Sequence, residues 1–218
     1  PHFGEERPIS GERGSGTIFF SCCNLFCVFC QNDDISHLAA GALFSPRELA
    51  LAMLRLQAAG CHNINLVTPS HVILPILESL EIAVAEGLNL PLVYNSGGYD
   101  APSTVELLAG VVDIYMPDLK FMDPELARRY TIAPDYPAVA TSAILAMQKS
   151  AGDLEVDHRG VATRGLLVRH LVLPGGTADS RAVLDFLAEK VSRHVYVNLM
   201  SQYHPCHRAR EFPPLDRP

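Results

Sequence analysis

The chain has 218 residues, of which 48% are hydrophobic and 19% are charged, so it is long enough for one globular domain with a sizeable core. The formal net charge is −7 and no block of Lys and Arg stands out, which leaves no electrostatic footprint for a nucleic-acid backbone. Pro, Gly or a charge interrupts every apolar run well before the ~20 residues that a membrane helix requires. We therefore expect a protein that binds neither nucleic acid nor a membrane. The start at Pro1, without Met, indicates a trimmed or processed chain.

Short β-branched or aromatic runs alternate with longer helical patterns from Gly16 onward. The predicted strands cover 17–20, 63–67, 92–95, 113–116, 166–171 and 194–199. Six βα alternations with nearly continuous apolar strands predict an α/β fold with a parallel sheet covered by helices. Six units cannot close as eight do, so we expect an open, partial (β/α)6 barrel. It forms a single domain over 1–218, with an N-terminal extension over 1–15 and a polar excursion or hairpin over 152–165.

Helix-start signals lie between these strands. Ser45 and Pro46 open a helix to residue 59, and Gly60 closes it as a C-cap. Ser70 is the predicted cap of a helix that runs to residue 86. Ser103 and Asp123 are the predicted caps of two shorter helices, and further helices are expected over 137–150 and 177–191.

The carboxyl ends of parallel strands form the edge where α/β proteins place their chemistry. That edge contains the segments 22–32, 68–71, 95–98, 116–120 and 201–207, together with Arg169 and His170. Nearly all chemically capable side chains of the chain fall there, so we expect the functional site at this edge. His170 should point away from Arg169 and serve as a packing histidine.

Cys23, Cys27 and Cys30 form a C-x3-C-x2-C motif on the loop after the first predicted strand. Three thiolates can bind three irons of a 4Fe-4S cubane and leave the fourth iron open for a small molecule. One alternative is a zinc knuckle, and another is buried cysteines without metal. A fourth zinc ligand would have to come from a residue without zinc-finger spacing: Cys22, Cys61, His62 or Cys206. Cysteines crowded in this way indicate metal in a reducing compartment, and we expect a cytoplasmic protein.

The segment 14–32, GSGTIFFSCCNLFCVFCQN, resembles the signature of radical S-adenosylmethionine proteins. More narrowly, it is similar to the group related to the pyruvate formate-lyase activating enzyme. The resemblance continues through Asp118-Leu119-Lys120 and Arg169 to Tyr203-His204. Two positions depart from the pattern, since Cys22 stands where the family usually has Gly and Phe26 stands where Arg is common.

This resemblance implies an enzyme, a radical S-adenosylmethionine oxidoreductase of the activating-enzyme type. Its 4Fe-4S cluster would cleave S-adenosylmethionine reductively to a 5′-deoxyadenosyl radical, which abstracts hydrogen from a substrate. The substrate could be a protein such as a glycyl-radical enzyme, and an electron donor of the flavodoxin or ferredoxin type is implied. The alternative function is a non-catalytic metal-binding module with a structural iron–sulfur or zinc site.

The resemblance also implies cofactor-binding residues. Phe29 stands at the position that lies against adenine, and Asn32 follows the third cysteine. Relatives carry a Gly-Gly-Glu segment that receives the ammonium group, and here Thr68 and Ser70 offer hydroxyl acceptors in that segment. For Ser70, helix capping is the competing interpretation.

A second group of residues is placed near the cofactor carboxylate or a cation. The resemblance puts Asn95, Ser96, Met116 and Asp118 in this region, with Asn95 replacing the usual carboxylate, and puts His204 near the cofactor. Lys120 lies two residues after Asp118, so both should face one side, as a carboxylate-binding pair or as a surface salt bridge. Arg169 interrupts an apolar run and should meet an anion, either Asp118 or the cofactor carboxylate.

Overall fold

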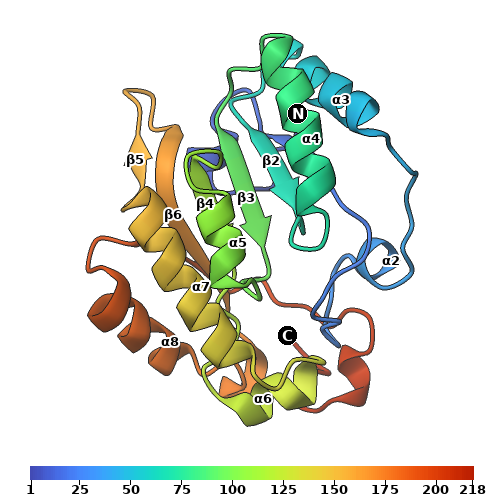
Figure 1. The fold of residues 1–218 in the computed structure, drawn as a ribbon. Helices are drawn as coiled ribbons and strands as arrows, with labels where there is room; N and C mark the ends of the chain where they lie inside the picture. The colour runs from blue at the N-terminus through green and yellow to red at the C-terminus, as the bar shows by residue number, and fades with distance from the viewer.

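The computed structural model describes all 218 residues. The chain forms a seven-stranded sheet with helices packed outside it (Figure 1). Six strands run parallel, in this order across the sheet: β1 (Gly16–Phe19), β2 (Ile64–Val67), β3 (Leu92–Ser96), β4 (Ile114–Pro117), β6 (Ala162–Leu171) and β7 (Tyr196–Met200). The short strand β5 (Glu155–Val156) pairs antiparallel with the start of β6. β1 and β7 do not pair, so the sheet stays open, and the predicted partial barrel in a single domain is confirmed.

Helices alternate with the strands along the chain. They are α3 (Pro46–Ala58), α4 (Ile73–Ala85), α5 (Pro102–Leu107), α6 (Pro124–Tyr130), α7 (Tyr136–Ala151) and α8 (Ser180–Phe186). One π-helical turn, Leu187–Val191, continues α8. Two further helices, α1 (Arg7–Ser10) and α2 (Asp33–Ser36), have one turn each, and 3-10 turns occur at Pro174–Gly176 and Ala209–Glu211. None of the helices combines the length and apolar character that crossing a membrane requires.

Two of the predicted helix caps are present and two are wrong. Ser45 forms a full capping box, in which its hydroxyl accepts from the Glu48 N–H and its own N–H donates to the Glu48 carboxylate. Asp123 caps α6 by accepting from the Glu125 N–H at 2.8 Å. The other two helices begin after Val72 and Ala101 instead of Ser70 and Ser103. Proline at the first position of α5 fixes its start two residues earlier than the serine signal suggested.

Alternate residues of β3, β4 and β6 contribute to two different hydrophobic clusters. Tyr94, Tyr115 and Val168 point outward and pack under the helices in the largest buried cluster. Their neighbours Val93, Ile114 and Leu167 point into the barrel, where they meet Ile9 of α1 and form a second cluster that closes the barrel at its amino-terminal end. The N-terminal segment is thus a plug at the bottom of the barrel.

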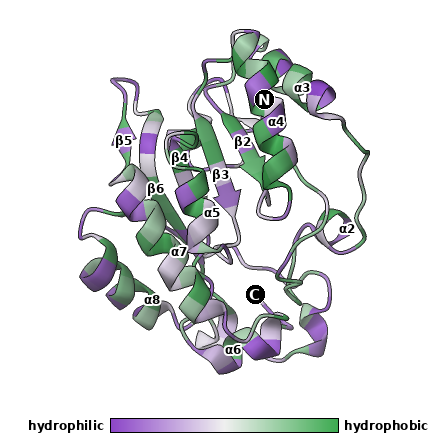
Figure 2. Cartoon of the chain, in the orientation of Figure 1, coloured by the Kyte–Doolittle hydropathy of each residue, from purple (hydrophilic) through white to green (hydrophobic).

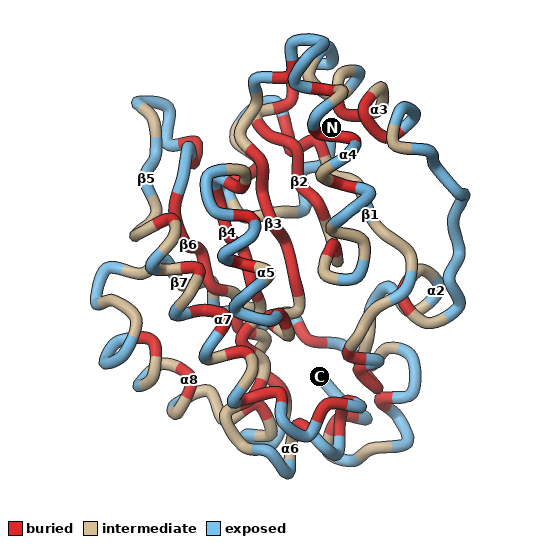
Figure 3. Tube along the Cα trace, viewed as in Figure 1, coloured by how far each residue is buried: buried red, intermediate tan, exposed pale blue.

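Polarity changes along the strands. Figure 2 shows hydrophobic residues over most of β2 and β3 and hydrophilic ones at the carboxyl end of β3, where Asn95 and Ser96 lie. Figure 3 shows the same strands buried along their length, while the arch between α2 and α3 is exposed. Polar side chains that are buried at the carboxyl end of a sheet need partners, and those partners define the site described next.

Candidate cofactor site

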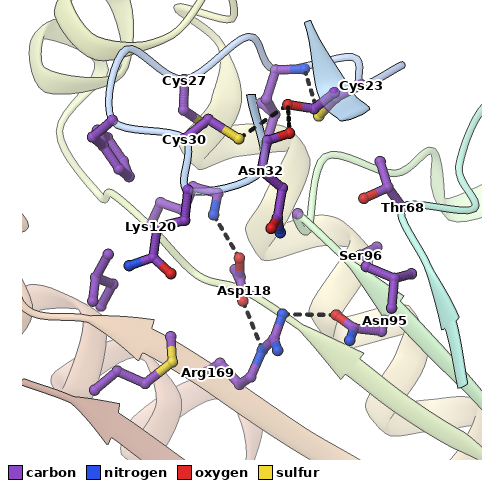
Figure 4. Close-up of a pocket in the computed structure, with 18 of the residues that line it drawn as sticks. Cys23, Cys27, Cys30, Asn32, Thr68, Asn95, Ser96, Asp118, Lys120 and Arg169 are labelled. Carbon is purple, nitrogen blue, oxygen red and sulfur yellow. Dashed lines mark hydrogen bonds and ion pairs between the residues drawn. The ribbon is translucent and has the colours of Figure 1, made fainter. Parts of the chain in front are cut away.

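A pocket of about 260 Å³ opens at the carboxyl ends of the strands. Most residues expected at the site line it, and Figure 4 shows how they lie around one space. They are Cys23, Cys27, Phe29, Cys30, Asn32, Thr68, Asn95, Ser96, Asp118, Lys120 and Arg169. These residues come from the cysteine loop and from the ends of β2, β3, β4 and β6, so the fold brings together positions far apart in sequence.

Three expected residues lie outside this pocket. The Ser70 hydroxyl sits 3.4 Å from the Tyr94 hydroxyl, which donates to it, and it neither lines the pocket nor caps α4. His204 is exposed, while the neighbouring Tyr203 is buried and donates to the Leu215 carbonyl at 2.6 Å. The segment after β7 reaches the pocket through Gln202 instead. Met116 is also outside, because it points into the lower barrel cluster.

The cysteine loop is fixed in place by its apolar side chains and its backbone. Leu25, Val28 and Phe29 are buried, and Phe29 meets Phe121 edge to face with 6.2 Å between ring centroids. The Val28 N–H donates to the Tyr130 carbonyl at 3.0 Å, at the end of α6, and the Ile132 N–H donates to the Leu25 carbonyl at 3.1 Å. The loop therefore presents its thiols from a rigid base.

The three motif thiols are free and differ in their surroundings. Burial raises the pKa of Cys27 to about 12, although the nearby Lys120 ammonium acts in the opposite direction. The Cys30 sulfur lies 3.0 Å from the Ser36 hydroxyl, and the Cys23 sulfur accepts from the Leu25 N–H at 3.4 Å. At a buried position, water cannot stabilise the negative charge of a Cys27 thiolate. The irons of a bound iron–sulfur cluster would stabilise it instead.

The side chains have no arrangement that suits a single metal ion. No group of three or more His, Cys, Asp or Glu side chains converges on one point as one ion requires. Three cysteines that each bind a different iron of a cubane need not converge in that way. The donor set of soft sulfurs on a short loop therefore fits a cluster.

Asp118 lies between two cations at the floor of the pocket (Figure 4). Its carboxylate is 2.5 Å from the Lys120 ammonium and 2.9 Å from the Arg169 Nε, and Arg169 also donates to the Asn95 side-chain oxygen at 2.7 Å. Their side chains are 16–17% exposed, so this is no surface salt bridge. Burial alone would raise the pKa of Asp118, but the two cations outweigh it and lower that pKa. The group stays ionised and holds both cations at the pocket.

The turns around this floor depend on residues that the sequence did not single out. Tyr136, at the start of α7, lies with its hydroxyl 2.9 Å from the carbonyls of Gly97 and Asp118 and accepts from the Lys120 N–H at 2.9 Å. Buried Asp100 accepts from the Ser96 hydroxyl at 2.6 Å, so that hydroxyl is already occupied. The sequence carries no local signal for either contact, because both join segments that meet only in the folded chain.

Further pocket residues also escaped the sequence-based prediction. Ser36 and His37 line the pocket from the one-turn helix α2, too short to show a helical period. His170, by contrast, is buried on the face opposite Arg169 as expected. Its ring nitrogens lie 2.6 Å from the Leu119 carbonyl and 2.8 Å from the Ser180 hydroxyl.

No protein-family model matches the chain. A protein of Methanocaldococcus jannaschii described as uncharacterized is 31% identical over 226 residues, covering 99% of this chain and 60% of that relative. Two solved structures, the native and the polyhistidine-tagged form of anSMEcpe with bound AdoMet, match with a TM-score of 0.59 and 11% identity, over 84% of this chain. The match covers 51% and 50% of those chains.

The structural likeness establishes the fold. This chain shares the partial-barrel fold of the matched part of these two AdoMet-bound structures. The chain spans between half and three fifths of the length of the proteins it matches.

Proposed function

We propose that the chain is a radical S-adenosylmethionine enzyme, in which Cys23, Cys27 and Cys30 hold a 4Fe-4S cluster. The observation that supports this most strongly is the shared pocket: the three cysteines line the same space as Asp118, Lys120 and Arg169. A pocket with soft sulfur ligands on one wall and fixed charges on its floor suits a zwitterionic cofactor that is held close to a metal cluster.

The chain's own residues would bind and orient the cofactor. Arg169 has N–H groups beyond those that Asp118 and Asn95 accept, and these can receive a carboxylate. Phe29 offers an apolar surface beside the third cysteine for an adenine ring. Thr68, Asn32 and the backbone of Ser96 add polar contacts around the opening. When bound, the cluster would supply the electron for reductive cleavage to a 5′-deoxyadenosyl radical, which abstracts hydrogen from the substrate.

The finer assignment is an oxidoreductase of the activating-enzyme type. We propose a protein substrate, such as a glycyl-radical enzyme, and an electron donor of the flavodoxin or ferredoxin type, because the C-x3-C-x2-C signature and the Asp118-Leu119-Lys120 segment resemble that group. The six free cysteines are compatible with a reducing compartment such as the cytoplasm.

A second candidate function is a metal-binding module that does not cleave the cofactor. Two observations favour it. Asn95 stands where the activating-enzyme pattern has a carboxylate, and Thr68 opens the segment where that pattern has Gly-Gly-Glu. Under this alternative the charged floor would be structural.

Anaerobic reconstitution with iron and sulfide separates the two. After addition of dithionite and S-adenosylmethionine, 5′-deoxyadenosine is quantified for the wild type, for Cys27→Ala and for Cys61→Ala. Cys61 is a matched control because it is buried but outside the cysteine loop. We expect product from the wild type and from Cys61→Ala and none from Cys27→Ala. A full 4Fe-4S complement without product would favour the non-catalytic module, and zinc in place of iron would refute the radical enzyme.

A further inference from the structure

Two glutamates of the N-terminal segment lie beneath the charged floor of the pocket. Glu5 reaches Arg169 from below, with 3.5 Å between its carboxylate and the Arg169 guanidinium, and it accepts from the Asn65 amide at 3.0 Å. Its side chain is 8% exposed. Arg169 is therefore held from two sides, by Asp118 above and by Glu5 below.

Glu6 lies in the same layer on the side of β7. One oxygen of its carboxylate accepts from the Asn198 amide at 2.6 Å, and the other is buried without a partner. Buried oxygens of Thr17 and Asn65 also lack partners, and these two residues are paired across β1 and β2, so they face the same side. The free carboxylate oxygen of Glu6 and the amide oxygen of Asn65 are acceptors without a donor, so the potential of this layer favours positive charge.

The N-terminal segment reverses the sign of the net charge on the floor of the pocket and the layer directly beneath it. The ionisable side chains of the floor are Asp118, Lys120 and Arg169, which sum to +1 when all are charged. Adding Glu5 and Glu6 changes the sum to −1. Two negative charges beneath the buried floor of the pocket change ligand affinity through Coulomb interactions that water screens only in part.

We propose that Glu5 and Glu6 are specificity residues that make the pocket prefer a cationic ligand to its neutral counterpart. This inference rests on the proposed function, since S-adenosylmethionine carries a net +1 through its sulfonium, whereas S-adenosylhomocysteine has the same amino and carboxylate groups and no net charge. The two ligands differ in the charge that the glutamates would sense. The N-terminal segment therefore acts on the ligand from beneath the pocket, in addition to plugging the barrel.

The test compares the binding of the two ligands to the anaerobically reconstituted, unreduced protein by titration calorimetry, so that no cleavage occurs. It is run at pH 8, because burial raises the pKa of Glu5. For Glu5→Gln we expect the affinity for S-adenosylmethionine to fall on the order of tenfold, as Coulomb's law gives for one charge at about 10 Å and an effective dielectric of about 20. The affinity for S-adenosylhomocysteine should change much less.

Glu6→Gln and Glu12→Gln complete the design. Glu6→Gln removes the same charge without touching Arg169, so it should lower the ratio of the two affinities even if Glu5→Gln folds poorly. Glu12 is exposed on the same segment, and its variant should keep the wild-type ratio. An unchanged ratio in both the Glu5 and Glu6 variants would overturn the inference. Wild-type protein that binds no S-adenosylmethionine would instead overturn the proposed function and, with it, this inference.

Discussion

At the scale of single residues, Cys22 and Thr68 hold a backbone conformation that usually belongs to glycine. Their φ angles are +72° and +59°, in the left-handed region that side chains other than Gly enter at a cost of about 1–2 kcal/mol. Cys22 stands where the resembled family usually has Gly, and Thr68 opens the segment where relatives carry Gly-Gly-Glu. Both of these departures from the family pattern are therefore also positions of local strain.

Replacing Cys22 by Gly should relieve this strain. We expect Cys22→Gly to raise the free energy of unfolding by about 1 kcal/mol, which urea denaturation would measure. The exposed thiol of Cys22 is not needed for cluster binding in our assignment, so iron and sulfide content after reconstitution should match the wild type. A loss of one or more irons per chain would instead identify Cys22 as a ligand.

Ser36 should tune the cluster through Cys30. Its hydroxyl lies 3.0 Å from the Cys30 sulfur, 2.9 Å from the Asn32 carbonyl and 2.9 Å from the His37 Nδ1. A hydrogen bond to a ligand sulfur stabilises the more negative, reduced cluster. We expect Ser36→Ala to lower the midpoint potential by on the order of tens of millivolts, with the cluster content unchanged. An EPR-monitored redox titration measures the shift, and an unchanged potential would show that the hydroxyl serves Asn32 instead.

At the scale of elements, the start of α7 ties together the ends of β3 and β4. The Tyr136 hydroxyl joins the Gly97 and Asp118 carbonyls to the Lys120 N–H, and the side chain is fully buried. We expect Tyr136→Phe to cost about 2 kcal/mol of unfolding free energy, because it leaves buried backbone groups without a partner. The control is Tyr99→Phe, whose more exposed hydroxyl donates to Asp135 and should contribute much less. Urea denaturation measures both unfolding free energies. Equal losses in the two variants would contradict the proposal that the Tyr136 hydroxyl ties the ends of β3 and β4 together.

The strands and the cysteine loop could be predicted because their signals are local. Short β-branched or aromatic runs mark each strand, and spacing alone groups Cys23, Cys27 and Cys30. That Arg169 meets an anion also follows from a local conflict, a guanidinium within an apolar run, although the sequence left open whether the anion is Asp118 or the cofactor carboxylate. Ser70 shows the limit of this approach, since a serine that reads as a cap contacts Tyr94 instead. Glu5 carried no signal at all, because its partners lie on β2 and β6 and come near it only through the fold.

At the scale of the whole molecule, the barrel interior has two layers of different chemistry. Ile9, Val93, Ile114 and Leu167 close the bottom, and the polar layer with Glu5 and Arg169 lies between them and the pocket. Both layers need the N-terminal segment, which supplies Ile9 to one and Glu5 to the other. Barrel closure and pocket charge are therefore coupled through the same few residues, so a change in the charge of Glu5 should also change the stability of the fold.

The pH dependence of stability should show this coupling. Burial raises the pKa of Glu5, and the Arg169 charge offsets this only in part. The folded state therefore binds a proton at Glu5 more tightly than the unfolded state does. This contribution to stability is fully present below the unfolded pKa and is lost as the pH rises through the folded pKa. Asp118 acts in the opposite direction, because its pKa is lowered and its contribution is lost as the pH falls through the folded value.

Glu5→Gln removes the first of these two contributions and leaves the second. The stability of the wild type relative to Glu5→Gln should therefore increase as the pH is lowered from about 8 towards about 4.5, because protonation relieves the buried charge in the wild type alone. Urea denaturation of the thiol-reduced proteins across this range measures the difference, and Glu12→Gln should follow the wild type at every pH. A difference that stays constant would mean that the pKa of Glu5 is the same in the folded and unfolded states, because the Arg169 charge then fully offsets burial. A difference that shrinks towards acid would mean that the ion pair with Arg169 outweighs burial, and that Glu5 anchors the N-terminal plug more strongly than its desolvation opposes it.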